Sequence, residues 1–141
     1  MNATVRQRGR IARVRRVQHN IATVKAARAQ RQVTELEASA EHLARLRASL
    51  AAQGGQTFGA ALAGVGELAE RLEQARAGLG KSIVNARAIA GLREGERMAA
   101  HRDQESAERL GKRAIEAAEK LRERRLAGRP RRRPGLAEDG E

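Results

Sequence analysis

One short stretch of the sequence approaches the pattern of a phosphate-binding loop. Residues 75–82 read ARAGLGKS, which fits G-x-x-x-x-G-K-[ST] except that Ala75 replaces the first glycine. A P-loop binds phosphate because a buried strand delivers it to the N-terminus of a helix, where backbone N–H groups are free. The preceding residues 67–74, ELAERLEQ, have a charged helical pattern instead. We therefore expect a junction between two helical segments here and no nucleotide cofactor.

The other residue types that do chemistry are scattered. The chain has no cysteine, and its three histidines, His19, His42 and His101, are far apart in sequence. No histidine pair at i, i+4 is accompanied by a third ligand, so we predict solvated histidines and no metal. The carboxylates lie in helical patterns beside Lys and Arg, without the apolar cleft that acid–base catalysis needs. We therefore predict a protein that is not an enzyme and has no small-molecule substrate.

Charge is the strongest compositional signal. The 141 residues carry a formal net charge of +12. Residues 1–31 contain nine Lys or Arg and no acid, and the first acidic residue is Glu35, whereas residues 93–126 are nearly balanced. This asymmetry predicts an acidic partner, which is a protein surface, a phosphate backbone or anionic lipid.

The apolar content is low and helical in its spacing. Leu, Ile, Val and Phe account for 26 of 141 residues, while Ala, Arg, Glu, Leu and Gln, all good helix formers, dominate. No run of about 18 apolar residues occurs, so we predict no transmembrane segment. The composition indicates a thin-cored helical protein.

The first arm of the chain is predicted as one helix over about residues 5–52. This helix carries two apolar stripes. The residues of the first are spaced by 3, 3, 4 and 3 positions, and those of the second repeat every seven positions. The register slips by about one residue near Arg28, between the two stripes. The first comprises Ile11, Val14, Val17, Ile21 and Val24, and the second Leu36, Leu43 and Leu50, with Leu46 beside it. Because the first stripe lacks aromatic residues, we interpret it as a helix–helix seam and not as a membrane-binding face.

A Gly-rich turn at 53–59 separates this helix from a second arm over about 60–126. Thr57 is expected to cap the second arm. A 4, 3 stripe follows, formed by Phe58, Leu62, Val65, Leu72, Leu79, Ile83, Ala86, Ala90, Ala100, Ala107, Ala114, Ala118 and Leu121. Arg93, Arg97 and Gln104 fall on the same stripe and weaken it midway. Because of Gly78 and Gly80, we predict a kink near Gly78–Ser82, with a helix end there and Ser82 capping the next segment.

Two amphipathic arms around one turn predict an all-α fold: an elongated antiparallel two-arm helical hairpin, or coiled coil, forming a single domain over 1–127. The arrangement places residues 5–31 beside 100–126, so the Arg-rich helix faces a set of acids. These are Asp103, Glu105, Glu108, Glu116, Glu119 and Glu123. A parallel homodimer is the alternative. Residues 128–141, rich in Gly, Pro and Arg, are predicted to be a disordered tail.

This pattern resembles the FliJ family of flagellar type III export, with its YscO-type injectisome counterparts. The resemblance covers about residues 5–126 and includes HRDQESAERLGKRAIEAAEKLRERR at 101–125. It implies a coiled-coil stalk that enters the hexameric ring of the export ATPase, contacts the export gate and escort chaperones, and supports flagellum biogenesis and motility. It also implies a cytoplasmic location, peripheral at the inner membrane.

Charge and position suggest two partner-binding sites. One, for the ATPase ring, lies at the end that carries both termini: Arg6, Arg10, Arg13, Arg122, Arg124 and Arg125. The other, for the export gate, is the apolar segment Phe58, Leu62 and Val65. The alternative function is non-specific binding of nucleic acid or ribosome by the arginines. The near absence of aromatic residues for base stacking disfavours it.

Overall fold

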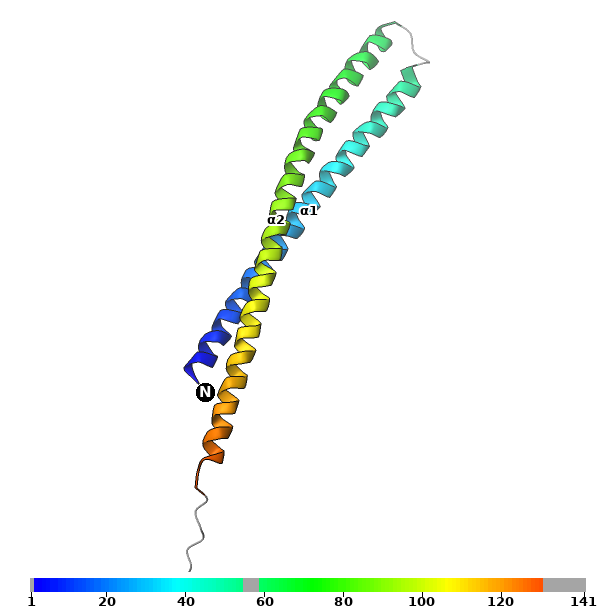
Figure 1. Ribbon diagram of the computed structural model, residues 1–141. Helices are drawn as coiled ribbons and strands as arrows, with labels where there is room; N and C mark the ends of the chain where they lie inside the picture. Colours follow the sequence, from blue (N-terminus) through cyan, green and yellow to red (C-terminus); the bar gives the residue numbers. More distant parts are fainter. Residues whose placement is uncertain (1, 55–58, 131–141) are drawn as a thin grey trace, which may run out of the picture. The chain divides into compact units, whose positions relative to one another are not determined.

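The structure is a computed structural model that describes residues 2–54 and 59–130. It is all-α, and no strand occurs in the described ranges (Figure 1). Helix α1 spans Ala3–Gly54 and helix α2 spans Ala60–Ala127, and the two pack as a hairpin. The two predicted arms are confirmed to within two residues at each end. Two predictions lie outside the described residues: the cap by Thr57 and the start of the second apolar stripe at Phe58. Residues 131–141 of the predicted tail also lie outside them.

Local signals explain where the helices begin and end. The Asn2 side-chain oxygen accepts a hydrogen bond of 3.1 Å from the backbone N–H of Thr4, which caps α1. Before α2, Gly59 has a φ of 73°, a left-handed conformation that favours glycine, and its carbonyl accepts the N–H of Leu62 at 3.0 Å. At the end of α2, the N–H of Gly128 bonds the Arg124 carbonyl at 3.0 Å, and Pro130 follows.

The chain divides into two packing units, which are described separately below. The terminal unit comprises residues 1–16 and 103–141, and the turn unit comprises residues 17–102. Each unit contains one segment of α1 and one of α2.

In the turn unit, the two segments meet along a seam with a seven-residue repeat. Ala26, Val33 and Ala86 are buried there. Half-buried residues extend the seam: His19, Ala22, Ala29, Leu36, Ala40, Leu43 and Leu50 from α1, and Val65, Ala69, Leu72, Leu79, Ile83, Ala90, Arg93, Arg97 and Ala100 from α2. The stripe predicted for this part of the second arm is therefore confirmed, including its charged members Arg93 and Arg97. Leu62, at its start, is half exposed.

The seam of α1 does not follow the stripe that was predicted from the bulkier residues. Val14, Val17, Ile21 and Val24 are 54%, 56%, 50% and 49% exposed, so their assignment to the seam is wrong, while Ile11 is half-buried. The seam instead continues the repeat of Leu36, Leu43 and Leu50 toward the N-terminus through alanines, without a slip at Arg28. Between residues 19 and 33, the seam is formed by His19, Ala22, Ala26, Ala29 and Val33.

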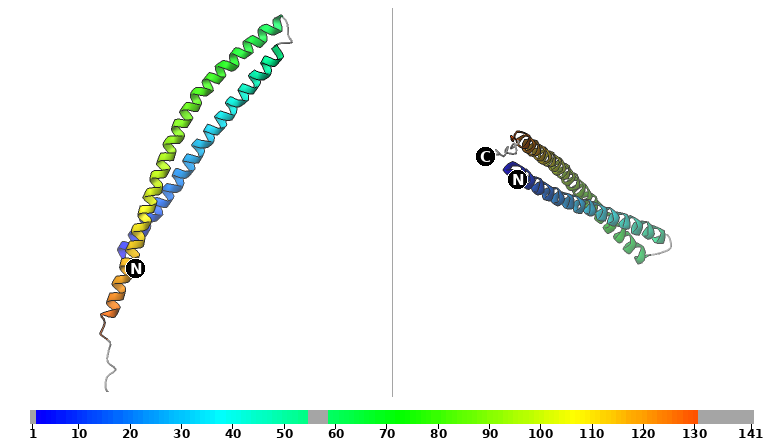
Figure 2. Two further views of the ribbon diagram at one scale, coloured as in Figure 1. Left: turned by 45° about the vertical axis from the view of Figure 1, so that its right-hand side comes forward. Right: turned by 90° about the horizontal axis from the view of Figure 1, so that it is seen from below.

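Helix α2 runs without interruption through residues 75–82. The predicted helix end at Gly78 or Gly80 and the cap by Ser82 are therefore wrong, and α2 only curves gradually in its green part (Figure 2). An added Cβ at Gly78 or Gly80 would meet nothing within 4 Å. A mid-helix backbone satisfies its own N–H groups, so ARAGLGKS does not have the geometry of a P-loop.

In the terminal unit the interface is thinner. Ala107 is the buried apolar residue there among those described. Residues around it are half-buried: Val5, Arg8, Gly9, Ile11 and Ala12 from α1, and Gln104, Glu108, Gly111, Ala114 and Ala118 from α2. Within the described residues, the predicted stripe members Ala107, Ala114 and Ala118 thus lie on this interface, while Leu121 is 49% exposed.

Candidate protein-interaction surfaces

Ion pairs across the seam of the turn unit establish an antiparallel register. An Arg87 guanidinium N–H donates to Glu37 Oε1 at 2.6 Å, and Arg47 pairs with Glu73. As the residue number on α1 rises from 37 to 47, the partner on α2 falls from 87 to 73. All four side chains are substantially exposed, so these pairs select orientation more than they stabilise.

Charged residues that occupy the seam are neutralised within α2 itself. Arg97 donates to Glu94 Oε1 at 2.6 Å, and Arg93 donates to Glu96 at 3.1 Å. The side-chain hydrogen bond from Arg97 lowers the pKa of Glu94. The aliphatic stems of both arginines can line the seam while their charged ends reach outward. This keeps the seam intact where large apolar residues are missing.

In the terminal unit, two arginines of α1 contact acids of α2 as expected from the hairpin. Arg15 lies 3.5 Å from Asp103, and Arg16 donates to Glu108 at 3.1 Å. Hydrogen bonds from Gln104 and then from Arg16 lower the pKa of Glu108. Of the remaining predicted neighbours, Glu105 pairs with Arg109 of its own helix. In the described part of the chain, Glu116, Glu119 and Glu123 make no ion pair.

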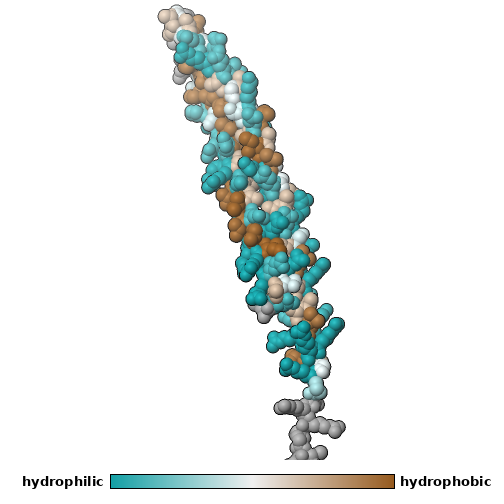
Figure 3. Space-filling view, turned by 90° about the vertical axis from the view of Figure 1, so that its left-hand side faces the viewer, coloured by the Kyte–Doolittle hydropathy of each residue, from teal (hydrophilic) through white to brown (hydrophobic). Residues whose placement is uncertain are grey.

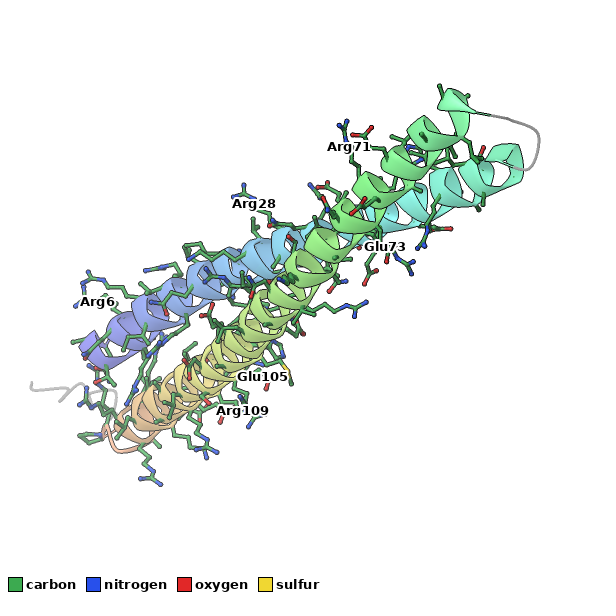
Figure 4. The ribbon with its side chains drawn as sticks, turned by 90° about the horizontal axis from the view of Figure 1, so that it is seen from above. Arg6, Arg28, Arg71, Glu73, Glu105 and Arg109 are labelled. Carbon is green, nitrogen blue, oxygen red and sulfur yellow. The ribbon has the colours of Figure 1, made fainter. Side chains whose placement is uncertain are left out.

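The six arginines predicted to bind an ATPase ring all belong to the terminal unit. They are Arg6, Arg10, Arg13, Arg122, Arg124 and Arg125, and each is exposed. None of the six forms an ion pair with another described residue. Arg6 projects from α1 on the side away from α2 (Figure 4). Their charges are therefore available to an acidic partner.

An open groove lies between the two helices of this unit and was not anticipated from sequence. Its volume is about 950 Å³, and Val5, Ile115, Leu121 and Leu126 provide its apolar lining. Arg122, Arg125 and Arg129 are its basic residues, and Asn2, Ala118 and Glu119 complete the wall. Two of the predicted arginines thus border an apolar surface, while Arg6, Arg10, Arg13 and Arg124 do not line the groove. Leu121 belongs to the predicted stripe of the second arm, but it is 49% exposed, so α1 does not cover the stripe at this position.

The segment predicted to contact an export gate is only partly described. Leu62 is 50% exposed, whereas Val65 is half-buried on the seam. Phe58 lies outside the described residues. Leu62 is therefore accessible to a partner, and Val65 contributes mainly to packing between α1 and α2.

One of the three histidines departs from the prediction that they are solvated: His19 is half-buried, whereas His42 and His101 are exposed as predicted. In the turn unit, the rings of His19 and His101 are 5.1 Å apart, so these residues are not isolated, and only His42 is exposed without such a neighbour. His19 shares the seven-residue repeat of Ala26 and Val33, and this repeat was the signal that would have placed it on the seam. Within the described ranges, no group of three or more possible metal ligands occurs.

Comparisons with known proteins do not assign the chain to a family. It matches no family model, no curated protein and no solved structure. Among the described residues, neither helix has a stretch that is both long and apolar enough to cross a membrane.

Proposed function

We propose that this chain is a non-enzymatic coiled-coil component of a flagellar type III protein export apparatus, whose terminal unit binds inside the ring of the export ATPase. The observation that carries the proposal is the uncompensated positive charge of that unit. Its described residues hold fourteen Lys or Arg against six Asp or Glu, and all six Lys or Arg of α1 in this unit precede any acid in the chain.

The groove supplies the second part of the argument. Apolar residues surrounded by cations suit a partner that presents both apolar side chains and carboxylates. Electrostatic attraction would orient the terminal unit during approach, and burial of Ile115, Leu121 and Leu126 would slow its release. The export gate and the escort chaperones are further partners in this proposal, and the accessible Leu62 is the candidate contact for the gate. The location proposed is peripheral at the inner membrane.

The experiment measures ATP hydrolysis by a purified flagellar export ATPase with and without this chain. We expect the chain to stimulate hydrolysis and to hydrolyse no ATP itself. The variant Arg6→Glu/Arg10→Glu/Arg13→Glu should abolish stimulation, because it reverses three exposed charges that have no ion-pair partner among the described residues. Leu121→Gln should weaken stimulation through the groove.

A matched variant controls for the general loss of positive charge. Arg76→Glu/Lys81→Glu/Arg102→Glu reverses three exposed cations of the turn unit that likewise have no ion-pair partner among the described residues, and it should stimulate like the parent chain. Full stimulation by the terminal variant would refute the proposed binding end. No stimulation by the parent chain, with its helicity intact by circular dichroism, would refute the function.

The same unpaired arginines favour one second candidate, a chain that binds nucleic acid or ribosome through phosphates. It predicts an affinity that falls linearly with the logarithm of salt concentration, with a slope of about −0.9 per phosphate neutralised on duplex DNA. Mobility-shift assays at low salt separate the two candidates. Stimulation of the ATPase without a shift supports the export role.

A further inference from the structure

Helix α1 carries a second regular stripe besides the one that packs on α2. Within the turn unit it comprises Val17, Ile21 and Val24, here termed the outer stripe, and the same 4, 3 spacing continues to Arg28 and Arg31. This alternation of fours and threes is the spacing by which a helix presents one continuous face to another helix.

The outer stripe lies on the side of α1 that faces away from the seam. Residues advance by about 100° per position around an α-helix, so Val17 and Val24 lie roughly opposite the seam residues His19, Ala22 and Ala26. The exposed fractions of the side chains agree with this placement, because Val17, Ile21 and Val24 are about half exposed whereas the seam residue Ala26 is buried. Arg28 likewise projects away from α2 (Figure 4).

Apolar side chains on the surface of this protein are single or in small groups in the view of Figure 3, separated by polar ones. The outer stripe differs because its members are spaced along one helix face at regular intervals. Three β-branched residues in such a row form a surface that another helix can cover, and covering it would remove apolar area from water.

The charges beside the outer stripe select the occupant. Lys25, Arg28 and Arg31 are exposed and form no ion pair with any other described residue. Arg28 and Arg31 also border an open pocket of about 440 Å³, which Gln32, Glu35, Leu36 and Ser39 complete. Carboxylates of a partner placed along this side would meet three unpaired cations.

We infer that the outer stripe docks an acidic amphipathic helix of a partner protein, with an apolar 4, 3 stripe of its own and Asp or Glu beside it. A second copy that docks through its own outer stripe fits poorly, because residues 1–31 contain no acid and cations would face cations in either orientation. An anionic membrane fits poorly as well, since the stripe is narrow and lacks the aromatic residues typical of interfacial helices. The inference does not rest on the proposed function.

The test uses the full chain and a labelled synthetic helix of about four heptads, with Ile and Leu in a 4, 3 stripe and Glu beside it. Fluorescence anisotropy should show saturable binding. The same peptide with Lys in place of Glu should bind at least about tenfold more weakly, which corresponds to about 1.4 kcal/mol. The variant Val17→Gln/Ile21→Gln/Val24→Gln, which leaves every charge in place, should also lose at least about tenfold in affinity for the Glu peptide.

The control variant is Val84→Gln/Leu92→Gln/Met98→Gln, which removes three similarly exposed apolar residues of α2 in the same unit. It should bind the Glu peptide like the parent chain, and both triple variants should keep the parent's helicity. Equal loss in the two variants, or equal binding of the Glu and Lys peptides, would overturn the inference. Failure of the Glu peptide to bind the parent would also overturn the inference if the parent instead self-associates or binds phosphatidylserine vesicles and the outer-stripe variant does not.

Discussion

His19 of α1 and His101 of α2 face each other across the seam of the turn unit, with ring centroids 5.1 Å apart and ring planes inclined by 48°. The hydroxyl of Thr23 lies 3.5 Å from Nε2 of His19 and donates to the His19 carbonyl at 2.9 Å. A polar ring thus occupies a position of the repeat that alanine and valine fill at Ala26 and Val33. The seam is therefore weaker here than its spacing alone suggests.

Replacing this ring by an aliphatic side chain should stabilise the hairpin. We expect His19→Leu to raise the free energy of unfolding by about 1 kcal/mol, because a half-buried seam position gains apolar contact. Thermal denaturation followed by circular dichroism measures the change. His42→Leu, at an exposed position of the same helix, should stay within about 0.5 kcal/mol of the parent. Equal effects would show that His19 is not a seam residue.

Two valines of α1 test which stripe forms the seam. Val33 is 3% exposed and Val24 is 49% exposed. Val33→Ala should lower the free energy of unfolding by about 1–2.5 kcal/mol, because two buried carbon atoms are lost and a small cavity remains. Val24→Ala should change it by less than about 0.5 kcal/mol. Urea denaturation compares the two, and the reverse order would mean that the outer stripe is the seam.

The uninterrupted α2 predicts the effect of replacing its glycines. Gly78→Ala and Gly80→Ala should each stabilise the protein by up to about 1 kcal/mol, since the new Cβ meets nothing within 4 Å and alanine favours a helix. Gly59→Ala should instead destabilise it, because its φ of 73° is left-handed. Melting temperatures give the comparison. Destabilisation by both mid-helix substitutions would indicate a break at 78–82.

Lys81 provides the corresponding test of nucleotide binding. Because residues 75–82 form turns of a helix, Lys81→Ala should leave the ATP binding of the chain, measured by titration calorimetry, the same as that of the parent. Arg76→Ala serves as the control for loss of one exposed positive charge. A specific loss of ATP affinity in the Lys81 variant would contradict the helical interpretation of ARAGLGKS.

Acid should weaken the terminal unit through Glu108. The hydrogen bonds from Gln104 and Arg16 favour its charged form, so its pKa in the folded chain is below the ordinary value of 4.5. Its stabilising contribution is therefore fully present above pH 4.5 and is lost as the pH falls through the lower folded value. Glu108→Gln should show a smaller drop in urea midpoint between pH 7 and pH 3 than the parent. Glu116→Gln, which removes a carboxylate without an ion pair among the described residues, should keep the parent's drop.

The sequence by itself determined the helices, the position of the turn, the stripe of the second arm and the uneven charge. These are local properties: good helix formers without proline give long helices, α1 ends at Gly54, and the left-handed Gly59 directly precedes α2. The charge pairs Arg15–Asp103 and Arg16–Glu108 followed once the hairpin was assumed. The groove bordered by Arg122 and Arg125 could not be predicted from the hairpin alone, because it depends on how the two helices are spaced at this end.

Only the tertiary structure decided which face of α1 meets α2. The helix carries two regular stripes, one of Ile and Val and one rich in Ala, and spacing alone favours neither. The second arm presents alanines at Ala86, Ala90 and Ala100, and packing against it buries Ala26 and Val33 of α1. Which face packs depends on how side chains that are distant in sequence fit together, and this fit is a property of the fold. The bulkier residues, which suggested the seam at first, are thereby left on the outer stripe.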